Sequence, residues 1–549
     1  MKRIEAMFGR AVEHHRAGRL EAASRDYRAV LAARPDHAPA LHLLGALAFE
    51  IGQTEAAINL MSAAVRVDAA VSAYHNDLGE ALRVAGRAEA AATEYRAALA
   101  LDPCNIAALN NLGIVEQLQG RRETAIGFYR RAIAIDMNFV PAQLNLGAAL
   151  LEAGEIEAAE PALETARRLD PGNSAATLNL ANLRQEQDRL DEAVTLYRGL
   201  LAADPAHVQA LVNLGQALQR LGRPDLAVEP FDAALVLAPD LPAVQWNAGL
   251  CRLLLGDFAR GWAGFGWRWR AGAVPPHGLP GPEWLGEPLA GRRLLVHAEQ
   301  GLGDTIQFAR FLKGLSERGA GEVILLARAP LRRLLAGLAR LVTADEPLPP
   351  WDCRIPLLDL PRLYGTVPAT TAGDVPYLVA APARVEEWRE RLADLPAPRI
   401  GLVWRGRADH ENDRNRSIPA AAFAPLTHDA AGWVSLQQGA TAAELKSLGP
   451  IRHLGDAFGD LQDAAEAISA LDLVISADTA LAHLAGALGK PVWILLPLAP
   501  DWRWLTERAD SPWYPSARLF RQTRAGDWGP VIEAVAAALG GFNASAPAG

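Results

Sequence analysis

The dipeptide Leu-Gly recurs at an interval of 34 residues, or twice that, through the first half of this 549-residue chain. It begins at positions 44, 78, 112, 146 and 214, and the related pairs Leu180-Ala181 and Ala248-Gly249 stand in the same register. A strict period of this length indicates a stack of helical hairpins rather than one globular core. Because such stacks bind extended partners along a groove, any chemistry is expected in the second half.

Other positions keep the same period. A glycine follows each pair by seven residues, with Asp188 as the exception, and it is predicted at the turn between two helices. Alanines at 57, 91, 125, 159, 193 and 227 let the helices of a hairpin approach closely, and an aromatic residue usually follows. Over roughly residues 3–270 the pattern resembles the tetratricopeptide repeat.

The residue before most of these pairs is a carboxamide. In the repeat this position lies on the first helix of each hairpin, which lines the concave side, and a column of carboxamides there can bind a peptide backbone. The column resembles the asparagine ladder of the O-linked N-acetylglucosamine transferase superhelix. The alternative is that each side chain caps a helix or contacts a neighbouring hairpin. The positions are Asp77, Asn111, Asn145, Asn179, Asn213 and Asn247.

Composition excludes several classes of protein. A net charge of -9 argues against a nucleic-acid binder, whose surface would be basic. Three widely spaced cysteines favour neither a disulfide framework nor a metal site. The first residues carry no apolar signal segment, and charged residues interrupt the most apolar stretch, 473–497. We therefore expect a cytoplasmic protein without a transmembrane segment.

The composition changes where the repeats end. Residues 256–269 hold Trp262, Phe265, Trp267 and Trp269, which are too many aromatic residues for another plain repeat. An interdomain core is favoured over a stacking platform for a ligand. Residues 271–289 are rich in Pro and Gly and are predicted to be a linker.

From residue 290 short apolar runs alternate with helical segments, which is typical of doubly wound α/β sheets. The runs fall into two groups, so the sequence predicts a first lobe over 290–382 and a second over 383–549. The whole chain is thus expected to be an α-solenoid, residues 1–270, followed by an α/β domain of two Rossmann-like lobes. Ligands of such folds bind at the carboxyl ends of strands.

The first strand leads into a loop with Gly301, Gly303 and Asp304. The glycines allow a tight turn and a close approach to a ligand. Asp304 has two interpretations, an N-cap of a helix over 305–315 and a general base that deprotonates an acceptor hydroxyl. One carboxylate can serve in both roles.

In the second lobe, Asp478 and Thr479 follow a strand and open a helix, whose free amides suit a diphosphate. Asp478 has the wrong charge for phosphate, so it is expected to cap the helix and orient its neighbours. His483 lies one turn further on. It is interpreted equally well as a ligand contact or as a packing histidine.

Two further segments offer polar side chains to a donor. The loop over 405–417 carries several arginines, which can clamp a pyrophosphate without a metal or pair with its own acidic residues. Arg416 is favoured because it directly precedes a predicted helix. The remaining candidates for donor binding are Ser417, His410, Gln437 and Gln438, the last two suited to a nucleobase or ribose.

The segments GLGDTIQFARFL and ISADTALAHLAGALGKPVWIL resemble glycosyltransferase family 9, the heptosyltransferases. The resemblance implies a two-lobed GT-B fold and an inverting, metal-independent enzyme that uses a nucleotide sugar, with Asp304 as base and Asp478, Thr479 and Arg416 near the donor phosphates. Together with the repeats, these segments look like bacterial repeat-fused glycosyltransferases, some of which modify proteins such as flagellin, so a protein acceptor in the repeat groove is expected. The alternatives are a lipid-linked or free saccharide acceptor, or a scaffold with degenerate lobes. No cofactor is expected.

Overall fold

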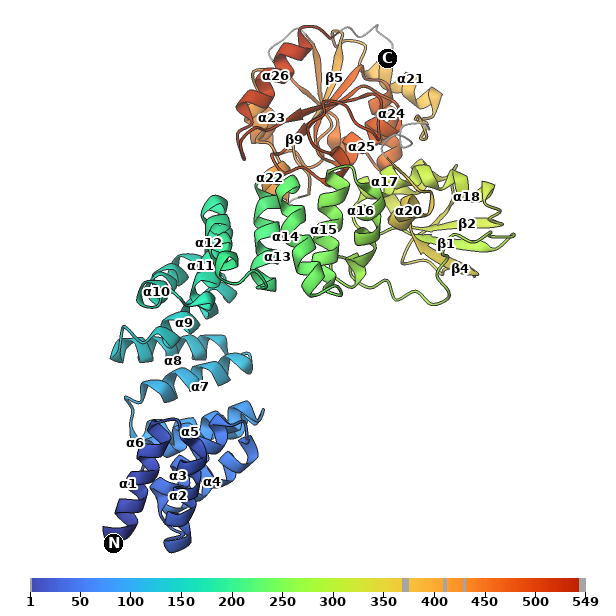
Figure 1. Ribbon diagram of the computed structural model, residues 1–549. Helices are drawn as coiled ribbons and strands as arrows, with labels where there is room; N and C mark the ends of the chain where they lie inside the picture. Colours follow the sequence, from blue (N-terminus) through green and yellow to red (C-terminus); the bar gives the residue numbers. More distant parts are fainter. Residues whose placement is uncertain (1, 368–374, 408–411, 428–430, 543–549) are drawn as a thin grey trace. The chain divides into compact units, whose positions relative to one another are not determined.

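The computed structural model describes residues 2–367, 375–407, 412–427 and 431–542. The chain forms two compact units, Met1–Pro205 and Ala206–Gly549 (Figure 1). Their boundary falls inside the predicted repeat array, so the last repeats belong to the same unit as the α/β lobes.

The first unit consists of helical hairpins whose two helices pack against each other. Its helices are α1 (Lys2–Arg16), α2 (Leu20–Ala33), α3 (Ala38–Glu50), α4 (Thr54–Val67), α5 (Ser72–Val84), α6 (Ala88–Leu101), α7 (Ile106–Leu118), α8 (Arg122–Ile135), α9 (Val140–Glu152), α10 (Ile156–Leu169), α11 (Ser174–Glu186) and α12 (Leu190–Ala203).

Two recurring residues of the repeat have a steric explanation. The turn residue is left-handed, with φ of +76° at Gly120 and +60° at Asp188, so the aspartate takes the conformation of the glycine it replaces. The glycine of the Leu-Gly pair makes room for an aromatic ring. A Cβ on Gly113 would lie 2.5 Å from Cε1 of Tyr129, a fully buried residue.

The second unit begins with two more hairpins, α13 (Val208–Arg220) with α14 (Pro224–Leu237) and α15 (Pro242–Leu254) with α16 (Phe258–Phe265), then the 3-10 turn η1 (Gly266–Trp269). The buried face of α16 packs on the second lobe. The Phe258 ring stacks on Trp513 at 5.9 Å, and Trp262 meets Trp502 edge to face at 5.3 Å. The Trp262 indole also donates to the Thr366 carbonyl at 3.1 Å. These contacts form the predicted interdomain core at Trp262, whereas Trp267 and Trp269, also predicted there, are only half-buried.

The first lobe contains a parallel sheet in the order β3-β2-β1-β4. The register pairs Arg293 with Glu322 and His297 with Leu326. Its elements are β1 (Arg293–His297), α17 (Leu302–Phe308), η2 (Ala309–Phe311), α18 (Lys313–Glu317), β2 (Glu322–Leu326), η3 (Ala329–Leu331), α19 (Arg332–Leu335), β3 (Arg340–Val342), β4 (Cys353–Pro356), η4 (Leu357–Asp359) and α20 (Leu360–Leu363).

The second lobe contains a parallel sheet in the order β10-β9-β8-β5-β6-β7. Its elements are α21 (Pro382–Arg391), β5 (Arg399–Val403), α22 (Asp413–Arg416), η6 (Ala420–Phe423), β6 (Gly432–Ser435), α23 (Ala442–Ser447), β7 (Arg452–His453), η7 (Gly455–Ala457), α24 (Leu461–Ser469), β8 (Leu473–Ala477), α25 (Ala480–Ala487), β9 (Val492–Leu496), η8 (Trp502–Trp504), β10 (Ala517–Arg521) and α26 (Gly529–Leu539).

Both sheets are parallel and their strands are largely buried, as expected for doubly wound lobes covered on both faces. Each sheet lies within one of the two predicted lobes. One apolar cluster joins Phe258 and Trp262 of α16, Leu294 of β1 and Val474 of β8. The last hairpin and the two lobes therefore share a core.

Candidate functional site

The loop after β1 turns sharply into α17. Gln300 is left-handed, with φ of +64°, and Gly301 is the N-cap of a helix that begins at Leu302. The sequence placed this helix start at residue 305, with Asp304 as its cap, and that placement is wrong. Asp304 lies in the first turn, and its Oδ2 accepts a hydrogen bond from the Gly301 backbone N–H at 2.7 Å. A Cβ on Gly301 would lie 2.9 Å from this Oδ2, so the glycine leaves room for the carboxylate that satisfies its amide.

The other Asp304 oxygen meets an arginine that the sequence analysis did not single out. Arg503, in η8, donates from Nη2 to Asp304 Oδ1, from Nε to Gln307 Oε1 at 2.6 Å and from Nη1 to Asp501 Oδ1 at 2.7 Å. The side chain is only 7% exposed. Arg503 thus connects α17 of the first lobe to the second lobe. The run Trp502–Trp504, with its two tryptophans beside an arginine, was the only sequence signal for it.

The N-terminal turns of α17 and α25 pack directly against each other. A Cβ added to Gly303 would lie 2.9 Å from Cδ2 of His483 and 3.3 Å from Cα of Ala480. Thr479 is the N-cap of α25, and its hydroxyl lies 3.0 Å from that of Ser476 at the end of β8. We call the turn that carries Gly301 and Gly303 the glycine loop. The structure therefore brings the glycine loop and the start of α25 together, although they are far apart in the chain.

Two guanidinium groups, those of Arg416 and Arg503, act on Asp478. Arg416 Nη1 donates to the Asp478 carbonyl at 3.3 Å, and the charges of Arg416 and Arg503 both favour its ionised carboxylate. Burial and then the charge of Asp501 act in the opposite direction and raise the pKa of Asp478 to about 6. The start of α25 therefore combines amide dipoles, two cations and a carboxyl group that binds a proton readily.

His483 is buried within the second lobe. Its ring stacks on Trp504 at 5.2 Å, and its Nδ1 lies 3.0 Å from the Tyr514 hydroxyl. Burial, with the charge of Arg503 as the next cause, holds the pKa of His483 well below its usual range. A neutral imidazole in these contacts is typical of a packing histidine, while donor binding by His483 stays a prediction.

The sequence suggested that Arg416 directly precedes a helix, and the structure shows otherwise. It is the last residue of the short helix α22, and Ser417 follows in extended conformation. Asp413 anchors both residues: its Oδ1 lies 3.6 Å from Arg416 Nε and accepts from the Ser417 hydroxyl at 2.8 Å. His410 lies outside the described residues.

The two glutamines at the end of β6 differ. Gln437 Oε1 accepts hydrogen bonds from the backbone N–H groups of Trp404 at 3.2 Å and Arg405 at 3.0 Å. This buried amide therefore holds the start of the arginine-bearing loop over 405–417. Gln438 is exposed. A donor contact by either residue stays a prediction.

A buried ionic cluster lies behind the glycine loop. Arg268 of η1 is fully buried and donates to Glu299 Oε1 at 2.6 Å and to Asp359 Oδ1 at 2.7 Å. Burial raises the pKa of Glu299 to about 7, and its Oε2 has no hydrogen-bond partner among the residues that the structure describes. The turn η1, which follows the last repeat helix, thereby holds Glu299, two positions before Gly301. No period or motif pointed to this cluster.

The carboxamides of the first unit bond to one another. Asn145 Nδ2 donates to Asn110 Oδ1 at 2.9 Å, Asn110 Nδ2 to Asn111 Oδ1 at 3.3 Å, and Asn111 Nδ2 to Asn76 Oδ1 at 3.5 Å. Each link between repeats joins residues 35 positions apart. This is the contact between neighbouring hairpins that the second interpretation of the column predicts.

The chain of hydrogen bonds ends at Asp77, which accepts from Asn76 Nδ2 at 3.0 Å and lies 2.7 Å from His42 Nε2. Asn179 is half-buried on α11. In the second unit, Asn213 is buried and accepts from Gln209 at 2.8 Å, and Asn247 is half-buried on α15. Peptide binding by these positions stays a prediction.

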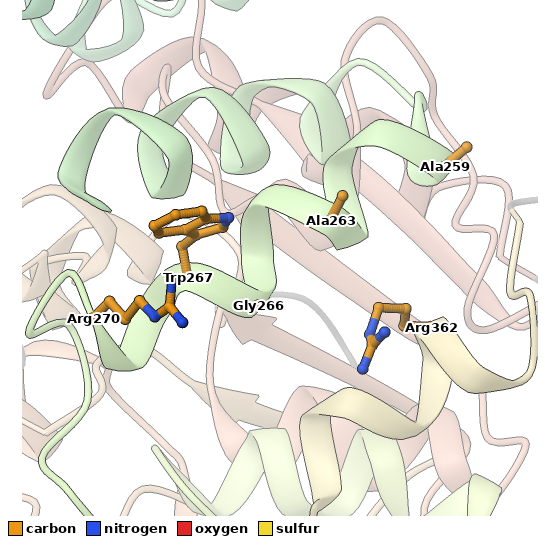
Figure 2. Close-up of a pocket in the computed structure, with 6 residues that line it drawn as sticks. All are labelled: Ala259, Ala263, Gly266, Trp267, Arg270 and Arg362. Atoms are coloured by element: carbon orange, nitrogen blue, oxygen red, sulfur yellow. The ribbon is translucent and has the colours of Figure 1, made fainter. Parts of the chain in front are cut away.

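A hollow of about 440 Å³ is lined by Trp267, Arg270 and Arg362 together with small residues of α16 and η1 (Figure 2). The Arg270 guanidinium lies 4.9 Å from the centre of the Trp267 ring. None of the residues around Asp304 and Asp478 lines this hollow, so it is separate from the candidate site.

Across the described parts of the chain, every helix is too short or too polar to cross a membrane. The described residues also include no group of three or more His, Cys, Asp or Glu side chains arranged to hold a metal ion.

The comparisons with known families find one kind of match in the N-terminal region and another near the C-terminus. Tetratricopeptide repeat families match residues 8–138 and 178–261 in overlapping segments, and 117–199 between them. The N-terminal region carries tetratricopeptide repeats. Glycosyltransferase family 9 (heptosyltransferase) matches residues 459–496. This segment contains Asp478, Thr479 and His483, but the match does not reach Asp304.

One curated relative, Protein FlbA from Caulobacter vibrioides, is 32% identical over 340 residues. The match covers 56% of each protein, so the chain spans about half the length of that relative. Among solved structures, MamA is 26% identical with a TM-score of 0.28, over 29% of this chain and 94% of that one. YrrB, described as a TPR protein with an unusual peptide-binding site, is 22% identical with a TM-score of 0.30, over 33% and 93%.

Proposed function

We propose that this protein is an inverting glycosyltransferase that uses a nucleotide sugar and modifies a protein held by its repeats. The observation that carries the proposal is the packing of α17 against α25. It puts Asp304 of one lobe beside the helix start of the other, and the family 9 match covers that helix start.

The donor diphosphate is assigned to the start of α25. Free amides at a helix N-terminus attract anions, and Arg416 and Arg503 add two positive charges there. Protonation of Asp478 removes the repulsion that its carboxylate would exert on phosphate. Burial, which raises the pKa of this group to about 6, makes that protonation easier when an anion binds.

Asp304 is assigned as the base. In the proposed reaction the acceptor oxygen attacks the anomeric carbon of the donor sugar, the bond from that carbon to the phosphate oxygen breaks, and the electron pair leaves with the phosphate. Asp304 takes the acceptor proton. A single displacement of this kind inverts the anomeric centre, and no step requires a metal ion.

Asp304→Asn tests the base. We expect transfer to fall by about 10²-fold or more, because the amide cannot accept the proton, while donor binding persists. Binding is measured by thermal shift and calorimetry with UDP, GDP, ADP and CMP sugars, since a bound ligand raises the melting temperature. Undiminished transfer by Asp304→Asn would rule out the base assignment. A chain that binds none of these donors would contradict the nucleotide-sugar assignment.

The repeats are proposed to present the protein acceptor. The carboxamides keep further donors and acceptors beyond the hydrogen bonds between repeats, because each amide offers two N–H groups and two lone pairs. A chain that starts at Ala206 removes the first compact unit. We expect it to bind the donor and to lose transfer to a protein acceptor. Protein transfer at the full rate by the shortened chain would contradict this role of the first unit.

A further inference from the structure

Arg503 connects the proposed base to the proposed donor site, and no family match extends to it. It follows β9, the strand beside β8 in the sheet, so it comes from the edge that also presents the start of α25. Its guanidinium lies 4.6 Å from the ring centre of Trp502 and 5.7 Å from that of Phe308. The charge therefore sits against apolar rings with little solvent around it.

All three guanidinium nitrogens have a partner, and the partners come from both lobes. Gln307 and Asp304 lie on α17, whereas Asp501 lies one residue before η8. A planar guanidinium in such a fork fixes the direction of each partner oxygen. Gly301 holds the other Asp304 oxygen, so the whole carboxylate has one orientation.

The same charge acts on the start of α25. Arg503 is among the groups that favour the ionised carboxylate of Asp478 and lower the pKa of His483. The negative charge of Asp304 and the anion expected at α25 thus share one buried cation.

We propose that Arg503 is a positioning residue that orients Asp304 and supplies the positive charge that the leaving phosphate needs. The inference rests on the proposed function. During transfer the acceptor proton neutralises Asp304 while negative charge develops on the phosphate oxygen. Arg503 loses one anionic partner and gains another in the same step, so its charge stays compensated in a site of low polarity.

Arg503→Ala tests the inference, with Arg508→Ala as the matched control because Arg508 lies in the same segment and pairs with the exposed Asp510. We expect Arg503→Ala to lower kcat by about 10²-fold with a smaller change in the donor KM, and Arg508→Ala to leave both unchanged. Added guanidinium ion, at concentrations that do not unfold the protein, should restore part of the kcat of Arg503→Ala only. Arg503→Lys should retain more activity than Arg503→Ala because it keeps the charge.

Three outcomes are distinguishable. Arg503→Ala with the kcat of the parent protein overturns this inference and leaves the proposed function intact. A folded variant with a reduced kcat that neither guanidinium ion nor lysine restores also overturns it, since a purely structural role would then explain the loss. A parent protein that neither binds nor transfers any nucleotide sugar contradicts the proposed function instead.

The contact itself has a test that needs no activity. The melting temperatures of Asp304→Asn, Arg503→Ala and the double variant form a cycle. If Arg503 holds Asp304, the double variant loses less than the sum of the two single losses. Additive losses would overturn the positioning role.

Discussion

Single residues in this protein carry charge in places where water does not reach. Arg268 and Arg503 are both buried, and each is held by two carboxylates. Removing one member of such a group is costly because its partner stays buried without compensation. The two arginines flank the glycine loop, Arg268 through Glu299 and Arg503 through Asp304. The position of this loop is thus set by ion pairs from other parts of the unit.

Glu299 gives a prediction about pH. Its pKa in the folded chain is about 7, above the ordinary value of 4.5, so the folded chain binds this proton more tightly than the unfolded chain does. The stability from that proton is fully present below about pH 4.5 and is lost as pH rises to about 7, a change of about 3 kcal/mol. The glutamine in Glu299→Gln does not titrate. The unfolding free energy of this variant should therefore fall less than that of the parent protein as pH rises from 4.5 to 7.

The measurement is urea unfolding of the second unit at several pH values between 4.5 and 7. Glu287→Gln is the control, because the pKa of this exposed carboxyl is lowered by its own backbone N–H and by Arg292, so it does not titrate in the window. Parallel curves for Glu299→Gln and the parent protein would show that the proton is not held at Glu299.

At the scale of elements, the site depends on how closely two helices approach. The first turn of α17 touches the first turn of α25 at Gly303, where a side chain would meet Ala480 and His483. The glycine is therefore explained by a helix contact as well as by the tight turn that the sequence suggested.

Gly303→Ala should separate the two helices. The added methyl group would lie 2.9 Å from the His483 ring, so the packing must shift, at a cost of about 1–3 kcal/mol. We also expect weaker donor binding, since the start of α25 moves. Thermal unfolding and calorimetry measure the two effects.

Gly266→Ala is the matched control, because it adds the same methyl group where, beyond the adjacent backbone, none of the described residues has an atom within 4 Å. It should be neutral or slightly stabilising. Equal effects of the two substitutions would contradict the steric explanation.

At the scale of the whole molecule, the compact units do not coincide with the boundary between repeats and lobes. The hairpins α13 to α16 belong to the same compact unit as the lobes, and the last hairpin shares a core with them through Phe258 and Trp262. Arg268 then adds a polar link to Glu299 and Asp359. A tetratricopeptide hairpin thus forms part of the same compact unit as the two α/β lobes.

This arrangement predicts where the chain can be cut. A chain over 206–549 should fold, because it keeps one compact unit. A chain over 271–549 should fail to fold cooperatively. It exposes Trp502 and Trp513 and leaves Glu299 and Asp359 without Arg268, which alone costs about 3–5 kcal/mol. Near-ultraviolet circular dichroism and the sharpness of thermal unfolding compare the two. Equally cooperative unfolding of both chains would contradict the shared core.

Much of the candidate site was predictable because it follows local rules. A glycine loop after a parallel strand and a Thr at a helix start can both be recognised from a few neighbouring residues. The start of α17 was misplaced because its cap is a glycine whose partner is the Asp304 side chain. Arg416 was placed before a helix instead of at the end of one because a four-residue helix, α22, leaves no periodic pattern.

The sequence alone determined the hairpin stack, its turns and the two parallel lobes. Repeats contact mainly their neighbours, so a fixed period contains nearly all of their packing. Only the tertiary structure decided which residues surround Asp304. Arg503 lies 199 positions from Asp304, and Arg268 lies 31 positions from Glu299. Such partners are chosen by how sheets and helices pack in three dimensions, and no spacing along the chain encodes that choice.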